Sequence, residues 1–174
     1  MRRAEVAHIV RAAKAITSER EFVLIGSQAA HLSIENLPPE MLQSGELDIY
    51  PLRHPDLADL LDGAIGEGSS FHATRGYYAQ GVGPETAKLP EGWKDRAIRV
   101  STPPMDGAVA IAPEIHDLCA SKAVANRPKD REYIEAAITA KIVEPMILNK
   151  RIGQVEGVDA DVLDVVRGWL SSFA

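Results

Sequence analysis

The sequence has little cysteine, few aromatic residues and no long apolar run. Its 174 residues include one cysteine, Cys119, so no disulfide can form within the chain and the fold needs no oxidising compartment. No apolar run approaches the roughly 20 residues that a membrane-spanning helix needs, and the first residues lack the apolar core of a signal peptide. We therefore expect a cytoplasmic protein without a membrane contact.

Basic residues are also in the minority. The 19 lysines and arginines against 25 aspartates and glutamates give a net charge of −6. Because indiscriminate binding to a nucleic-acid backbone depends on a basic surface, this balance argues against broad, non-specific DNA binding. A local basic pocket for a nucleotide remains possible. The hydrophobic share of 45% is ordinary for a folded protein of this size and excludes extensive disorder.

The spacing of apolar residues predicts strands and helices that alternate in the first two thirds of the chain, with helices alone after that. The expected strands cover residues 22–25, 44–51, 77–82, 97–100 and 108–111, and the expected helices residues 6–17, 28–32, 55–65, 113–125, 129–138 and 162–170. This order predicts an α/β (α+β) fold with a mixed sheet flanked by helices. We expect residues 1–112 to form this core and residues 113–174 to form a helical region packed on it.

Two acidic residues share one face of an expected strand. Glu46 and Asp48 are two positions apart in a stretch where acidic and apolar residues alternate, so both carboxylates project to the same side. Neighbouring carboxylates repel each other unless a cation lies between them, and Mg²⁺ prefers such oxygen ligands together with substrate phosphates. The pair therefore predicts a metal-dependent phosphoryl- or nucleotidyl-transfer site, the alternative being a solvated strand edge.

Gly26 and Ser27 follow the apolar strand 22–25 and precede a helical composition. Glycine permits a close backbone approach, and the free N–H groups at a helix start attract anions, so this turn is a candidate phosphate site. Glycine and serine also occupy such turns for steric reasons alone.

A basic cluster follows in the second half of the chain. Four cations, Lys122, Arg127, Lys129 and Arg131, stand with Asp130 at an expected helix–helix connection. If this connection folds over the sheet, the cations could hold a triphosphate and Asp130 could orient one of them or meet a metal. The alternative is a solvated loop with ordinary helix-end charges.

In combination these features resemble the nucleotidyltransferase superfamily. Its motif, an apolar residue followed by Gly-Gly or Gly-Ser and then a strand of alternating acidic and apolar residues, matches Ile25-Gly26-Ser27 and Glu46-Leu47-Asp48-Ile49. More closely, the chain resembles bacterial nucleotidyltransferase-like proteins of unknown function related to AbiEii-type toxins. Their further elements match Leu89-Pro90-Glu91-Gly92-Trp93, then Ser121-Lys122, then Arg127-Pro128-Lys129-Asp130.

The resemblance implies a metal-dependent transferase that moves a nucleotide from an NTP to an RNA or protein acceptor. Glu46 and Asp48 would be catalytic and hold Mg²⁺ or Mn²⁺, with Asp130 as a further catalytic or orienting acid. The residues in contact with the nucleotide would be Gly26, Ser27, Lys122, Arg127 and Lys129. Such a protein could be the toxin of a toxin–antitoxin pair, with a cognate antitoxin as partner, or a phage-defence component.

Two departures from the family pattern leave other interpretations open. Glu46 stands where many active members have aspartate, and Arg99, on the strand 97–100, stands where a third strand carboxylate would be expected. A catalytically degenerate binding or interaction module with the same fold is therefore one alternative. A small-molecule nucleotidyltransferase of the aminoglycoside-modifying kind is the other, and an acidic cleft would favour it.

Overall fold

A five-stranded mixed sheet is the centre of the computed structural model, which describes residues 1–173. The strand order is β3-β2-β1-β5-β4. β1 pairs antiparallel with β2 and parallel with β5, β2 pairs parallel with β3, and β4 pairs antiparallel with β5. The bounds are β1 Glu21–Ile25, β2 Glu46–Pro51, β3 Tyr78–Gly81, β4 Ile98–Val100 and β5 Val109–Ala112. The predicted mixed sheet with flanking helices is thereby confirmed.

β1 is the middle strand because its apolar side chains can be buried on both faces of the sheet. Phe22 and Leu24 belong to the large apolar core, whereas Val23 and Ile25 belong to a smaller cluster on the opposite face. All four side chains are almost completely buried. A strand that is apolar throughout is stable only in such a position, as the sequence predicts.

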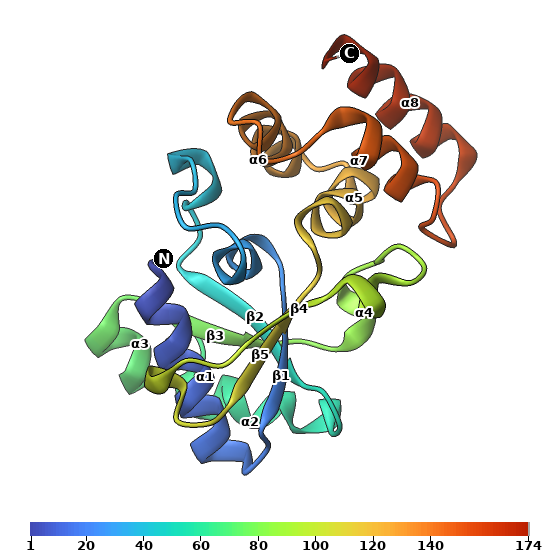
Figure 1. The fold of residues 1–174 in the computed structure, drawn as a ribbon. Helices are drawn as coiled ribbons and strands as arrows, with labels where there is room; N and C mark the ends of the chain where they lie inside the picture. Colours follow the sequence, from blue (N-terminus) through green and yellow to red (C-terminus); the bar gives the residue numbers. More distant parts are fainter. Residues whose placement is uncertain (174) are drawn as a thin grey trace.

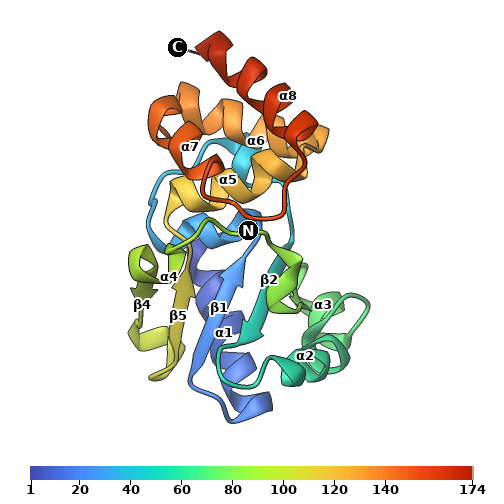
Figure 2. The same ribbon diagram turned by 90° about the vertical axis from the view of Figure 1, so that its right-hand side faces the viewer.

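The large core lies between the sheet and helix α1 (Arg3–Thr17), which runs behind the strands in Figure 2. The apolar residues Val6, Ile9, Val10 and Ala13 recur at helical spacing and are all buried. α2 (Ala58–Ile65) packs against β3 and α1.

Several short helical segments differ from the sequence-based expectation. The segment after Gly26 is a six-residue 3₁₀ helix, Ser27–Leu32, and not an α-helix. Residues 63–70, which are rich in glycine and serine, lead into an unexpected helix α3 (Ser70–Arg75). Ser69 caps its start by accepting a hydrogen bond from the amide of His72, and Gly76 ends it in the left-handed region. α7 (Pro145–Ile152) is a further short helix that begins at a proline, a residue that otherwise signals a break.

Within residues 1–173, four α-helices follow β5 and lie beyond one end of the sheet (Figures 1 and 2). They are α5 (Ile115–Ala125), α6 (Pro128–Thr139), α7 and α8 (Ala160–Leu170). Their buried residues Leu118, Ile134 and Leu148 belong to the same apolar core as the buried residues of α1. Across residues 1–173, none of the helices combines the length and the apolar character that crossing a membrane requires.

Buried ion pairs centred on Asp117 connect these helices to the segment before β4. Asp117 on α5 is fully buried and accepts hydrogen bonds of 2.9 and 3.0 Å from Arg96, which ends α4 (Trp93–Arg96). Arg151 of α7 lies 3.2 Å from the same carboxylate. Gly92, with φ +73°, begins α4 in a conformation that favours glycine. The Glu91 carbonyl accepts a hydrogen bond of 2.9 Å from Arg96, and the Glu91 N–H donates one of 2.8 Å to the carbonyl of Gln154, so the Leu89–Trp93 element helps to hold the helices over the sheet.

Candidate functional site

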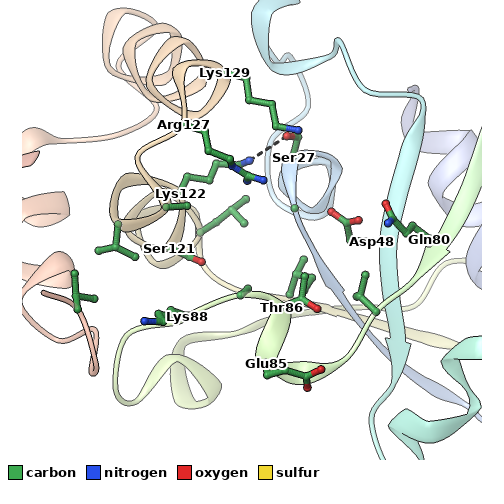
Figure 3. A pocket seen from close by; sticks show the side chains of 18 of the residues that line it. Ser27, Asp48, Gln80, Glu85, Thr86, Lys88, Ser121, Lys122, Arg127 and Lys129 are labelled. Atoms are coloured by element: carbon green, nitrogen blue, oxygen red, sulfur yellow. Dashed lines mark hydrogen bonds between the residues drawn. The ribbon is translucent and has the colours of Figure 1, made fainter. Parts of the chain in front are cut away.

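A cavity of about 650 Å³ lies where the sheet meets the C-terminal helices (Figure 3). It is within the range of pockets that hold nucleotide-sized ligands. Residues of β1, β2 and β3 line it on the sheet side, and residues of α5 and of the α5–α6 connection line it on the helical side. The cavity therefore brings together segments that are about 80 residues apart in the sequence.

The two predicted strand carboxylates both line this cavity. Glu46 and Asp48 alternate with the buried Leu47 and Ile49 on β2, as a period of two requires. Burial and the negative charge of Glu46 together raise the pKa of Asp48 to about 6, although the cations of the opposite wall act to lower it. Negative charge on Asp48 is thus costly, and a cation bound beside it would relieve that cost.

Gly26 allows Asp48 to take this position. Its backbone has φ +74° and ψ −172°, a conformation that is open almost only to glycine. A Cβ at residue 26 would overlap the Oδ2 atom of Asp48 and lie 3.0 Å from its Cγ. The predicted Gly-Ser turn therefore serves the carboxylate strand directly, by leaving room for one of its side chains.

The opposite wall of the cavity carries positive charge (Figure 3). Lys122 on α5 donates a hydrogen bond of 3.1 Å to the hydroxyl of Ser27. Arg127 and Lys129 come from the start of α6 and also line the cavity. In Figure 3 these cations lie on one side of Ser27, with Asp48 on the other side. An anion held by the cations would therefore also meet the carboxylate end of the site.

Behind this wall, Asp130 holds two of the cations in place. It is 1% exposed and accepts hydrogen bonds from Lys122 at 3.2 Å and from Arg127 at 2.5 Å. Burial by itself would raise the pKa of Asp130, but the hydrogen bonds and charges of these two cations outweigh it and hold the pKa below its usual value. Asp130 is thus an ionised, buried partner whose geometry favours the orienting role over that of a metal ligand.

Two tyrosines complete the surroundings of the site. The Tyr133 hydroxyl donates a 3.0 Å hydrogen bond to the carbonyl of Ser27, and its ring lies 4.6 Å from the Lys122 ammonium. On the sheet side, the Tyr78 hydroxyl donates a 3.1 Å hydrogen bond to Glu46. Burial and this bond raise the pKa of Tyr78 to about 12, so its hydroxyl remains a donor at neutral pH.

Seven of the eight predicted site residues line this same cavity, and Asp130 lies directly behind its cationic wall. The seven are Gly26, Ser27, Glu46, Asp48, Lys122, Arg127 and Lys129. One part of the expectation does not hold, because the helix after Gly26 is a single short 3₁₀ segment and offers little of the anion attraction of a long α-helix.

A third strand carboxylate was expected at the position of Arg99, but the outer neighbour of the carboxylate strand β2 is β3. Arg99 lies on the edge strand β4, forms an ion pair with Glu21 and does not line the cavity. The residue beside Asp48 is Gln80, its register partner on β3. Gln80 and Tyr133 were not singled out from the sequence as parts of this site, and Tyr78 was considered for a base pocket but interpreted as a packing residue. Their signals were the alternation of residues 77–82 and the three-residue spacing of Asp130 and Tyr133 on one helix.

Comparison with known proteins places the chain in a family. The chain matches a family model described as "Nucleotidyltransferase of unknown function (DUF6036)" over residues 4–167. No curated protein and no solved structure matches the chain at a significant level. The match covers the sheet, both walls of the cavity and most of the C-terminal helices. The chain therefore belongs to this family of nucleotidyltransferases of unknown function.

Proposed function

We propose that the cavity binds a nucleoside triphosphate together with a divalent cation and transfers its nucleotidyl group to an acceptor. The observation that carries this proposal is the placement of two strand carboxylates and three cations on opposite walls of one cavity. Arginine and lysine groups are the usual partners of phosphate oxygens, and paired carboxylates are the usual protein ligands of Mg²⁺ in such sites. The triphosphate would span the distance between the two walls.

The residues present fit the cation that this chemistry requires. Asp48 has a raised pKa because it is buried beside Glu46, so a bound cation would compensate both charges. Two carboxylates leave most of an octahedral shell to waters and phosphate oxygens, which suits Mg²⁺ or Mn²⁺. When bound, the ion would neutralise charge on the phosphates and orient them. Glu46 and Asp48 would hold it.

The remaining residues would bind and orient the triphosphate. Lys122 and Arg127, fixed by Asp130, and Lys129 would contact phosphate oxygens, and Ser27 would keep Lys122 aimed into the cavity. In the transfer, an acceptor hydroxyl oxygen forms a bond to the α-phosphorus as the bond to the β-phosphate oxygen breaks. Pyrophosphate leaves, and the proton of the hydroxyl passes to water. The cations stabilise the negative charge that develops on the leaving group.

The acceptor is an RNA or a protein in this proposal, and the resemblance to AbiEii-type toxins would make the chain a toxin or phage-defence component with a cognate antitoxin. The aminoglycoside alternative gains no support from the cavity. Its lining contains the acids Glu46, Asp48, Glu85 and Asp159 and also the cations Lys88, Lys122, Arg127 and Lys129, so its walls do not form the acidic cleft that a cationic substrate needs.

A second candidate is a module that binds the nucleotide and does not transfer it. The observation that favours it is the neutral Gln80 beside Asp48, which leaves Glu46 and Asp48 without a third carboxylate on the adjacent strand. An assay for transfer of label from α-labelled NTPs to a mixed RNA and protein pool separates the two functions, since label transfer excludes the non-catalytic module.

The binding that both candidates share is tested by the variant Asp48→Asn, which removes one charge and keeps the side-chain size. We expect calorimetry to show Mg²⁺-dependent NTP binding at least about 100-fold weaker than in the wild type, because a direct ligand is lost. The matched control is Asp56→Asn, which neutralises an exposed acid outside the cavity and should leave binding unchanged. Unaltered Mg²⁺-dependent binding in Asp48→Asn would refute the proposed site.

A further inference from the structure

The strand next to the carboxylates carries no charge of its own. β3 runs parallel to β2, with Tyr78 in register with Glu46 and Gln80 in register with Asp48. Neighbouring residues in register project to the same face of a sheet, so a phenol and an amide stand beside the two carboxylates. In Figure 3 the amide of Gln80 lies next to the carboxylate of Asp48.

The other neighbouring strand adds no ligand either. Ile25 of β1 is the register partner of Asp48, and Gly26, which has no side chain, follows it. Within residues 1–173, acidic, histidine and cysteine side chains form no group of three that could hold a metal ion. Glu85 and Asp159 line the same cavity without joining the carboxylate pair. The acidic end of the site therefore consists of Glu46 and Asp48 alone.

This set of ligands fits one divalent cation better than two. One Mg²⁺ is commonly held by one or two carboxylates together with phosphate oxygens. Two such ions in a shared site lie roughly 4 Å apart, and their mutual repulsion has to be offset by further anionic ligands between and around them. Here one oxygen of Glu46 also accepts the hydrogen bond of Tyr78, so it has less capacity for a second ion.

The helical wall supplies positive charge by other means. Lys122 is 7% exposed and is fixed by Ser27 and Asp130, and Arg127 is fixed by the same Asp130. These fixed cations face the space in which the phosphates would lie (Figure 3). They can compensate phosphate charge without a second metal ion, because lysine and arginine groups bind phosphate oxygens directly.

We propose that the site holds a single divalent cation and that Gln80, as a neutral residue beside Asp48, excludes a second one. This inference rests on the proposed function, because it concerns the same cation site. It assigns to Gln80 the role of setting the metal stoichiometry, which neither the family match nor the carboxylate pattern assigns.

Equilibrium dialysis against Mn²⁺ and inorganic triphosphate tests the proposal, since triphosphate is common to all NTPs. We expect one Mn²⁺ per wild-type chain, with the electron paramagnetic resonance spectrum of an isolated ion. Gln80→Glu adds a carboxylate at the register position of Asp48 and should bind a second Mn²⁺, with the spin–spin broadening of two ions roughly 4 Å apart. Gln80→Asn keeps the residue neutral and should remain at one ion.

Each other result overturns the inference in a distinguishable way. Two ions on the wild-type chain would show that the neutral strand β3 does not limit the site, while leaving nucleotide binding intact. A single ion on a folded Gln80→Glu variant, with its fold checked by circular dichroism, would show that Gln80 is not the limiting residue. No bound Mn²⁺ on the wild-type chain would overturn the proposed function as well.

Discussion

Replacement of Gly26 by alanine should disrupt the cation site by displacing the carboxylate of Asp48, although the methyl group of alanine is itself unreactive and uncharged. The backbone at Gly26 has φ +74° and ψ −172°, and placing a Cβ in this region costs about 1–3 kcal/mol. The same Cβ would overlap Oδ2 of Asp48, so the carboxylate has to move away from its present position. We expect Mg²⁺-dependent NTP binding to weaken by roughly 10- to 100-fold, as when the support of a metal ligand is lost.

A matched glycine separates the backbone cost from the displacement of Asp48. Gly107 has φ +75°, but a Cβ at this position would meet no atom within 4 Å. Gly107→Ala should therefore lower the free energy of unfolding by about 1–2 kcal/mol and leave NTP binding unchanged. For a chain of this size, each kcal/mol corresponds to a Tm shift of about 2–4 °C, which a thermal unfolding scan resolves.

A double-mutant cycle identifies the clash itself. In an Asp48→Ala background, the Oδ2 and Cγ atoms are absent, so Gly26→Ala should cost only its backbone strain, measured by urea unfolding at pH 7. The reasoning is refuted if Gly26→Ala binds Mg²⁺ and NTP as tightly as Gly107→Ala does. It is also refuted if the destabilisation by Gly26→Ala is the same whether or not the Asp48 carboxylate is present.

Two further predictions concern the charged groups on the two walls. The pKa of Asp48 is about 6 in the folded protein against an ordinary 3.8, so the folded state holds this proton more tightly than the unfolded chain and stability falls as the pH rises from about 4 to about 6. Without divalent cations, Asp48→Asn should therefore raise the free energy of unfolding at pH 7 by at most about 3 kcal/mol and change it little at pH 4. A variant that is no more stable than the wild type at pH 7 in urea titrations would contradict this. On the other wall, Asp130→Asn leaves Lys122 and Arg127 without their shared anion and should lower the free energy of unfolding by about 3–5 kcal/mol. If Asp130 positions these cations for phosphates, calorimetry should show that the variant loses more affinity for an NTP than for the matching monophosphate. The matched control is Asp117→Asn, which breaks a buried ion pair outside the cavity. It should destabilise the fold without changing the ratio of NTP affinity to monophosphate affinity. If this ratio is the same in both variants, the role of Asp130 is structural alone.

The fold class could be predicted from the sequence because its signals are local. The apolar strand Phe22–Ile25, the alternating strand around Glu46 and Asp48 and the amphipathic first helix each record their burial in their own spacing. The short helices α3 and α7 carry weaker signals, because six to eight residues span barely two turns and their capping glycine, serine and proline also occur in loops.

The candidate site was predictable only as separate parts. Residue types and spacing singled out Gly26, Glu46, Asp48 and the cluster from Lys122 to Asp130, but they did not specify the distance between them. Gln80 was not predicted as a site residue, because its position beside Asp48 depends on the parallel register of β3 against β2. The sequence of β3 does not specify this register. The third carboxylate was expected at Arg99 instead, because β3 and β4 are both short and from their sequences either could lie beside the carboxylate strand β2.

By itself, therefore, the sequence determined the strands and the longer helices, which face of each is buried and that two carboxylates share one side of a strand, because periodicity and residue chemistry fix these properties locally. Only the tertiary structure decided that Lys122 and Arg127 face those carboxylates across one cavity, that Asp130 is buried behind the cations and that a neutral glutamine stands beside Asp48. These relations join residues that are distant in the chain. They depend on strand register and on how the C-terminal helices pack over the sheet, and both are set by the burial of the whole core rather than by any one segment.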